Sequence, residues 1–172
     1  MKLILGGVFK GYNLVKQPTS EIPEQVSKVV ENLNKNSHSY SYTPTWYFGS
    51  KATENGTSYL VTCERQKNEF KQIRLMTVVI SNGRSRVNLE SLILPEPFQK
   101  LFDSAMGNSE EIKHMPLTFV GFESTPKGKN YYVLCQSEIK NHESYVTIVI
   151  ISEQGELIDT IRLGGLGYAF TW

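Results

Sequence analysis

Long hydrophobic runs are missing from this chain of 172 residues. No segment approaches the eighteen or more apolar residues that a membrane-spanning helix requires, so no membrane partner is expected. Residues 1–9 are apolar, but Gly6 and Gly7 interrupt them and no cleavage region follows, which argues against a signal peptide.

Cysteine and net charge are both scarce. Two cysteines, Cys63 and Cys135, are too few for a disulfide framework and favour a reducing, cytoplasmic compartment. The alternative is a mature secreted protein whose signal has been removed. The 18 basic and 17 acidic residues give a formal charge of +1, which provides no electrostatic basis for binding nucleic acid.

Motifs for catalysis and for cofactors are lacking as well. The sequence contains no Walker loop, dinucleotide fingerprint or Gly-x-Ser-x-Gly elbow. Its histidines, His38, His114 and His142, all fall in expected loops, and none has a second metal ligand at a suitable spacing. We therefore expect a protein that is not an enzyme and that needs neither a metal nor a cofactor.

What the chain does contain is an internal repeat. Residues 44–94 align without a gap to residues 116–166 after a shift of 72 residues. Nine of the 51 aligned positions are identical, where about three would be expected from average composition. They are prolines, turn glycines and core residues: Pro44/Pro116, Gly49/Gly121, Thr53/Thr125, Gly56/Gly128, Tyr59/Tyr131, Val61/Val133, Cys63/Cys135, Gly83/Gly155 and Leu94/Leu166.

The hydrophobic pattern repeats with the identities. Each copy has a strand-like segment (residues 59–63 and 131–135), then a second (75–80 and 146–151), a turn (81–83 and 153–155) and a third (86–93 and 157–163). Asn82-Gly83 is a strong hairpin signal because both residues tolerate positive φ. Cys63 and Cys135 occupy matching strands, which predicts packing rather than nucleophilic catalysis.

A helix is expected before each sheet. In the first copy Ser20 is the expected N-cap, and the apolar face is Ile22, Val26, Val29, Val30 and Leu33. In the second copy Pro95 and Pro97 open a shorter helix that ends at Gly107, and its apolar face is Phe98, Leu101, Phe102, Ala105 and Met106. Residues 34–43 and 108–114 are expected loops. The sequence thus predicts an α+β fold of two tandem units, 1–94 and 95–172, each with one helix packed on a four-stranded antiparallel sheet.

This layout resembles that of the cystatins, and the first copy resembles the intracellular cystatins, or stefins. The trunk Leu3-Ile4-Leu5-Gly6-Gly7 is similar to the glycine-bearing N-terminus of that family, and residues 18–22 are similar to its helix start. The run Asn55-Gly56-Thr57-Ser58-Tyr59-Leu60-Val61 resembles the family's Ala-Gly-Thr-Asn-Tyr-Tyr-Ile segment, and residues 128–133 resemble it again.

The resemblance implies an inhibitor of papain-like cysteine proteases. Stefins block the active-site cleft with a wedge made of the glycine trunk and two hairpin loops. By position, the wedge would comprise Gly6, Gly7, Ala52, Thr53, Glu54, Asn55, Gly56, Ser81, Asn82 and Gly83. The partner would then be a papain-like protease.

The alternative is a non-inhibitory cystatin-like scaffold that binds a protein partner within a larger assembly. Ala52 stands where the family's loop has glutamine, and Glu54 stands where it has valine. Desolvating a charged Glu54 in an apolar cleft costs free energy unless the charge is paired. The aromatic tail, residues 167–172, is expected to be buried as a closing strand, with an exposed anchor as the alternative.

Overall fold

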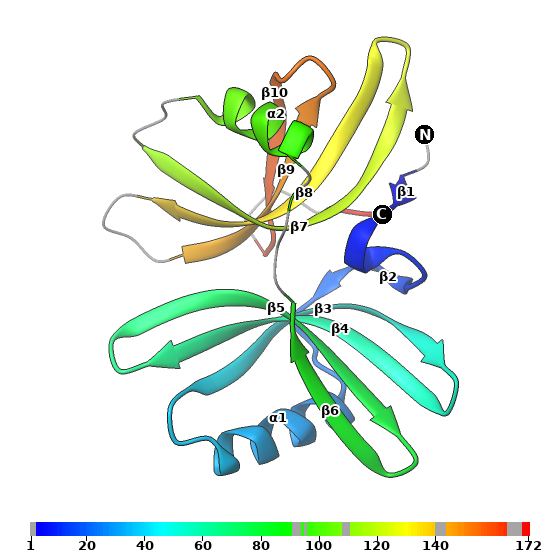
Figure 1. Cartoon of the computed structure of the whole chain (residues 1–172), viewed down its shortest axis with the longest axis vertical. Helices are drawn as coiled ribbons and strands as arrows, with labels where there is room; N and C mark the ends of the chain where they lie inside the picture. Colours follow the sequence, from blue (N-terminus) through cyan, green and yellow to red (C-terminus); the bar gives the residue numbers. More distant parts are fainter. Residues whose placement is uncertain (1–2, 91–93, 95, 108–110, 140–143, 165–169) are drawn as a thin grey trace. The chain divides into compact units, whose positions relative to one another are not determined.

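The fold is α+β and contains two five-stranded antiparallel sheets, each with one helix (Figure 1). A computed structural model describes residues 3–90, 94, 96–107, 111–139, 144–164 and 170–172. The described residues of Tyr12–Ser91 and Thr171–Trp172 form one compact unit, here named the α1 unit. Those of Met1–Gly11 and Leu92–Phe170 form the other, the α2 unit.

The α1 unit is built from β2 (Asn13–Thr19), α1 (Glu24–Asn36), β3 (Ser41–Thr53), β4 (Gly56–Lys67), β5 (Phe70–Ser81) and β6 (Arg84–Leu89). Its strands are ordered β2-β3-β4-β5-β6. Because neighbouring strands follow one another in the chain, the sheet is a meander of tight hairpins, as the sequence predicts.

The predicted apolar face of α1 forms the core of this unit. Val26 and Val30 are buried against Val61 and Cys63 of β4 and against Met76 and Val78 of β5. The β4 residues are two apart, so they share one face of the sheet, and the helical residues are one turn apart. Burying each valine stabilises the fold by about 1.5–3 kcal/mol. The expected N-cap is wrong, however, because α1 begins at Glu24 after Pro23 and has no side-chain cap.

The α2 unit repeats this arrangement. It contains α2 (Glu96–Met106), β7 (Ile112–Thr125), β8 (Gly128–Ile139), β9 (Ser144–Ser152) and β10 (Leu157–Arg162). The predicted helix face packs on the sheet here too, with Phe102 buried against Val133, Cys135, Val149 and Ile151. Gly107 ends the helix with φ 56°, and its amide donates to Asp103 O at 3.2 Å, so the predicted C-cap is confirmed.

Each sheet has one strand more than the four expected. In the α1 unit the fifth strand is β2, where Leu14 pairs with Gly49 and Asn13 pairs with Ser50. In the α2 unit it is β1 (Ile4–Leu5), from the start of the chain, where Leu5 pairs with Gly121 and Ile4 with Phe122. A shift of 72 residues converts one set of β3 partners into the β7 set, so the two strands occupy the same register.

The division into compact units therefore differs from the sequential one expected from the repeat. The segment before the second helix is already used as β6 of the first copy, so residues 3–9 supply the missing strand of the second. At the other end of the chain, the amide of Trp172 donates to Lys16 O of β2 at 3.3 Å, and the rings of Trp172 and Phe48 lie 6.0 Å apart. Residues 167–169 of the tail lie outside the described residues.

The predicted loops are shorter than expected. Asn34 belongs to α1 and Tyr42 to β3, so the first loop is confined to residues 37–40. His114, expected in a loop, lies in β7, where it pairs with Ser137. Alternation of polar residues with tyrosine hid the start of β3, since one face of that strand is exposed.

Gly49 and Gly121 are identical in the two copies because the fifth strand passes very close to them. A methyl group at Gly49 would overlap the carbonyl oxygen of Asn13, and one at Gly121 would overlap the carbonyl oxygen of Ile4. Both glycines were expected to mark turns, but they lie within β3 and β7 at irregularities of the register.

Substitution of Gly121 by alanine tests this constraint. We expect Gly121→Ala to lower the free energy of unfolding by about 1–3 kcal/mol, because β1 must move away from β7 to admit the methyl group. Urea denaturation measures the change. The control is Ser124→Ala, on an exposed position of the same strand, which should change the value by less than about 0.5 kcal/mol. Equal stabilities of Gly121→Ala and the parent would contradict the close approach.

Candidate binding surface

The two hairpin loops expected to bind a partner lie side by side in the α1 unit. Thr53 and Gly56 flank the β3–β4 turn, while Asn82 and Gly83 form the β5–β6 turn. Gly56 pairs with Ser81 across the β4–β5 ladder, and the Ser81 hydroxyl donates to the carbonyl oxygen of Asn55 at 3.2 Å. Residues 53–56 and 81–84 are here named the hairpin end.

The backbone at the hairpin end is closely constrained. A methyl group at Gly56 would overlap the carbonyl oxygen of Ile80, so this glycine is required by the approach of β5. Asn82 and Gly83 have φ of 51° and 74°, the left-handed pair of a tight two-residue hairpin. The side chains of Glu54 and Arg84 are exposed. The geometry therefore presents solvated polar groups on a rigid frame.

The equivalent end of the α2 unit uses its side chains internally. The Glu153 carboxylate accepts a hydrogen bond from the Lys129 amide at 2.9 Å. Thr125 donates to Gly128 O at 2.7 Å, and the Gln154 amide donates to Lys127 O at 3.5 Å. Since these groups satisfy one another, fewer of them are available to a partner than at the hairpin end.

Gly6 and Gly7, the predicted trunk, lie in the α2 unit as part of its sheet. The Gly6 amide donates to Val120 O at 2.9 Å. A side chain at Gly6 would meet the Phe119 ring at 2.7 Å, and Gly7, with φ 56°, begins the short 3-10 helix η1 (Gly7–Phe9) beside β7. Phe119 in turn packs edge-on against Phe98 of α2, with the ring centres 5.4 Å apart. Both glycines thus serve close packing in this unit.

Neither thiol is placed for nucleophilic chemistry. Cys63 and Cys135 are fully buried at equivalent positions, where each is paired with a proline of the neighbouring strand. Burial raises the pKa of Cys63 to about 12, against an opposing effect of Arg74 and Arg65. Burial also raises the pKa of Cys135. Both thiols therefore stay protonated at neutral pH.

The histidines are dispersed. His114 lies 2.5 Å from the Ser137 hydroxyl through Nδ1, and burial lowers its pKa. Ser137 is fully buried, so this pair is closed to a substrate. His38 lies in the loop after α1, and His142 falls outside the described residues. No group of three or more His, Cys, Asp or Glu side chains in the described part of the chain could hold a metal ion.

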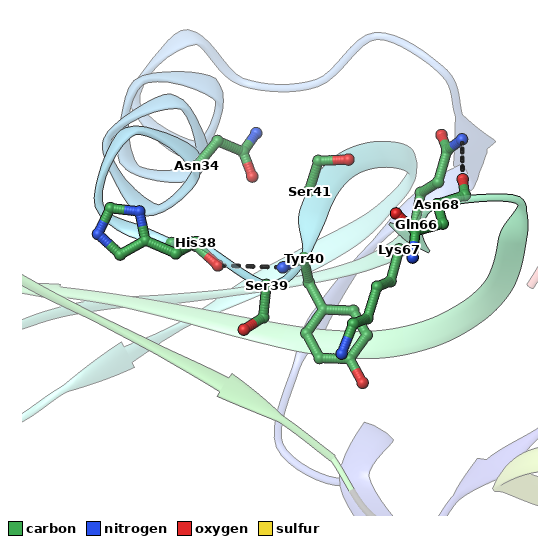
Figure 2. A pocket seen from close by; sticks show the side chains of 9 residues that line it. Asn34, His38, Ser39, Tyr40, Ser41, Gln66, Lys67 and Asn68 are labelled. Atoms are coloured by element: carbon green, nitrogen blue, oxygen red, sulfur yellow. Dashed lines mark hydrogen bonds between the residues drawn. The ribbon is translucent and has the colours of Figure 1, made fainter.

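A pocket of 420 Å³ at the opposite end of β4 was not predicted (Figure 2). It lies between the end of α1, the loop that follows and the β4–β5 turn, and is lined by Asn34, Ser37, His38, Ser39, Tyr40, Ser41, Gln66, Lys67 and Asn68. Short polar side chains are abundant in loops of every function, so the sequence gave no periodic signal that these segments meet.

Comparisons with protein-family models, curated proteins and solved structures return no match for this chain. Within the described residues, neither α1 nor α2 is long and apolar enough to cross a membrane. The functional argument therefore rests on the chain's own geometry.

The state of the thiols can be measured directly. Because both are buried and protonated, we expect neither Cys63 nor Cys135 to react with an aromatic disulfide reagent in the folded protein at pH 8, and both to react in denaturant. Thiols whose pKa is raised by folding also destabilise the fold as the pH rises above 9.0, since only the unfolded chain then ionises. Labelling of either thiol in the native state at the rate of a free thiol would contradict this placement.

Proposed function

We propose that this protein is a non-catalytic, cystatin-like binding protein whose hairpin end holds a protein partner, without the three-part wedge of the stefins. The observation that carries the proposal is the hydrogen bond from the Gly6 amide to Val120 O. This bond makes the glycine trunk a strand of the α2 sheet. The protein partner is then held by the hairpins of the α1 unit, as in a scaffold or assembly subunit.

The exposed groups of the hairpin end favour a polar partner surface. Glu54 and Arg84 are exposed and of opposite charge, and neither forms an ion pair among the residues the structure describes. A partner surface of complementary charge can pair with both, and rim charges of this kind direct specificity and association rate. A rigid backbone also lowers the entropy lost on binding.

One observation favours the second candidate, inhibition of a papain-like cysteine protease. The predicted loops are adjacent, because Gly56 pairs with Ser81 and Asn55 accepts from Ser81. Two adjacent hairpins could enter a cleft without the trunk. Against this, Glu54 would lose its hydration in an apolar cleft, and no carboxylate-pairing group of the chain accompanies it.

Titration into papain separates the two candidates. Under the proposed scaffold function, we expect the full chain at up to about 100 μM to leave the hydrolysis of a fluorogenic substrate unchanged, because an interaction weaker than that is worth less than about 5.5 kcal/mol. A stefin serves as the positive control. Inhibition at micromolar or lower concentration that is weakened by Glu54→Arg would overturn the proposal and establish the inhibitor.

Charge reversal at the hairpin end tests the binding surface. We expect the double variant Glu54→Arg with Arg84→Glu to lose a partner that the parent chain retains from an extract of its source cells. The matched control is Lys127→Glu, which reverses a charge on the corresponding turn of the α2 unit and should retain the partner. All substitutions are on exposed turns, so stability should change by less than about 0.5 kcal/mol. Equal retention by both variants would exclude the hairpin end as the surface.

A further inference from the structure

The pocket beside Tyr40 has a fixed frame. The Asn34 side chain both donates to the Tyr42 carbonyl and accepts from the Tyr42 amide, at 2.8 Å each, which ties the end of α1 to the start of β3. The Ser37 hydroxyl accepts from the Tyr40 amide at 3.3 Å. The Gln66 amide donates to Asn68 O at 3.1 Å and holds the other wall. A site held in this way needs little reorganisation to receive a ligand.

Two cations share the ring of Tyr40 at this pocket. The Arg65 guanidinium carbon lies 4.5 Å from the ring centre, and the Lys67 ammonium lies 5.4 Å from it. Figure 2 shows Lys67 running alongside the ring, with His38 on the opposite side of the pocket. The positive charge of the site is therefore concentrated beside one aromatic side chain.

These cations have no carboxylate partner in the described part of the chain. The neighbouring Glu64 pairs with Lys71 at 3.7 Å instead, and Arg65 donates to the neutral Gln72 side chain at 2.6 Å. The Nε atom of Arg65 is buried and makes no hydrogen bond among the described residues. Glu69, in the adjacent turn, is exposed and forms no described ion pair. Like charges held together without a counter-charge favour the binding of an anion.

The internal repeat shows that the fold does not require this arrangement. A shift of 72 residues places Ile112 at the position of Tyr40, Ser137 at that of Arg65 and Ile139 at that of Lys67. The ladders agree, because Tyr42 pairs with Arg65 as His114 pairs with Ser137. Two units with the same strand pairing thus differ in whether a cationic site is present.

We propose that this pocket binds an oxyanion, the carboxylate or phosphate group of a ligand, at Lys67 with hydroxyl donors from the loop after α1. Ser39 and Ser41 line the pocket and can donate to such a group, and Arg65 holds the Tyr40 ring and adds its charge. The side chain of Phe70, paired with Lys67 across the turn, is 63% exposed. It provides an apolar contact next to the pocket for a ligand that continues beyond its anionic group.

The test is a titration of the isotope-labelled full chain, followed by amide chemical shifts at constant ionic strength. The probes are inorganic phosphate, and a short peptide of glutamates interrupted by one leucine. We expect saturable shifts confined to residues 37–41 and 66–68. Saturation with phosphate identifies a free small anion as sufficient, whereas saturation with the peptide alone, weakened by Phe70→Ser, identifies an acidic segment of a protein. Linear shifts with both probes would overturn the proposal.

Variants copied from the other repeat complete the test. Tyr40→Ile with Lys67→Ile places in the α1 unit the residues that occupy these positions in the α2 unit, and we expect it to raise the dissociation constant about tenfold or more. Lys67→Gln, a smaller change, tests the same point if the double variant does not fold. Lys28→Gln, which removes an exposed charge of α1, should bind like the parent. An unchanged dissociation constant for Lys67→Gln would refute the site.

Discussion

The close approach of a fifth strand to a glycine in the middle of its neighbour is the constraint on which the rest of this structure depends. Leu14 lies against Gly49 in one sheet and Leu5 lies against Gly121 in the other. Each glycine leaves room for a carbonyl oxygen that a Cβ atom would displace. Because the two pairs are related by the 72-residue shift, the second sheet needs a strand at this place as much as the first does.

That requirement decides what the start of the chain can do. A free glycine trunk could contribute to a protease-blocking wedge, but a trunk whose Gly6 amide is bonded to Val120 O is a structural strand. Detaching it would leave a β7 carbonyl without its partner, which costs free energy where water cannot replace the bond. Binding is therefore better assigned to parts of the chain that the sheets do not use, such as the hairpin end and the pocket beside Tyr40.

The duplication separates what the fold needs from what it can vary. Helix faces, core cysteines and the two strand glycines are kept in both copies, because each contributes to packing that either unit must have. The turns and loops differ. Glu153 and Thr125 bond within their own hairpins, whereas the hairpin end leaves Glu54 and Arg84 exposed. Tyr40 and Lys67 are likewise present in one copy only, at positions where the other has isoleucine.

The sequence by itself determined the repeat, its register, both helices and the strands that follow them, because these depend on local periodicity and on short turns. It also identified the two hairpin loops as neighbours, since they join consecutive strands of a meander. Only the tertiary structure decided where residues 3–9 belong, because β1 is two residues long and its partner strand is more than a hundred residues away. The pocket beside Tyr40 was equally beyond prediction, since three separate segments converge there and their polar residues carry no periodic signal. Local interactions are written in short stretches of sequence, whereas the pairing of distant segments depends on which sheet edge remains unfilled once the local elements have formed.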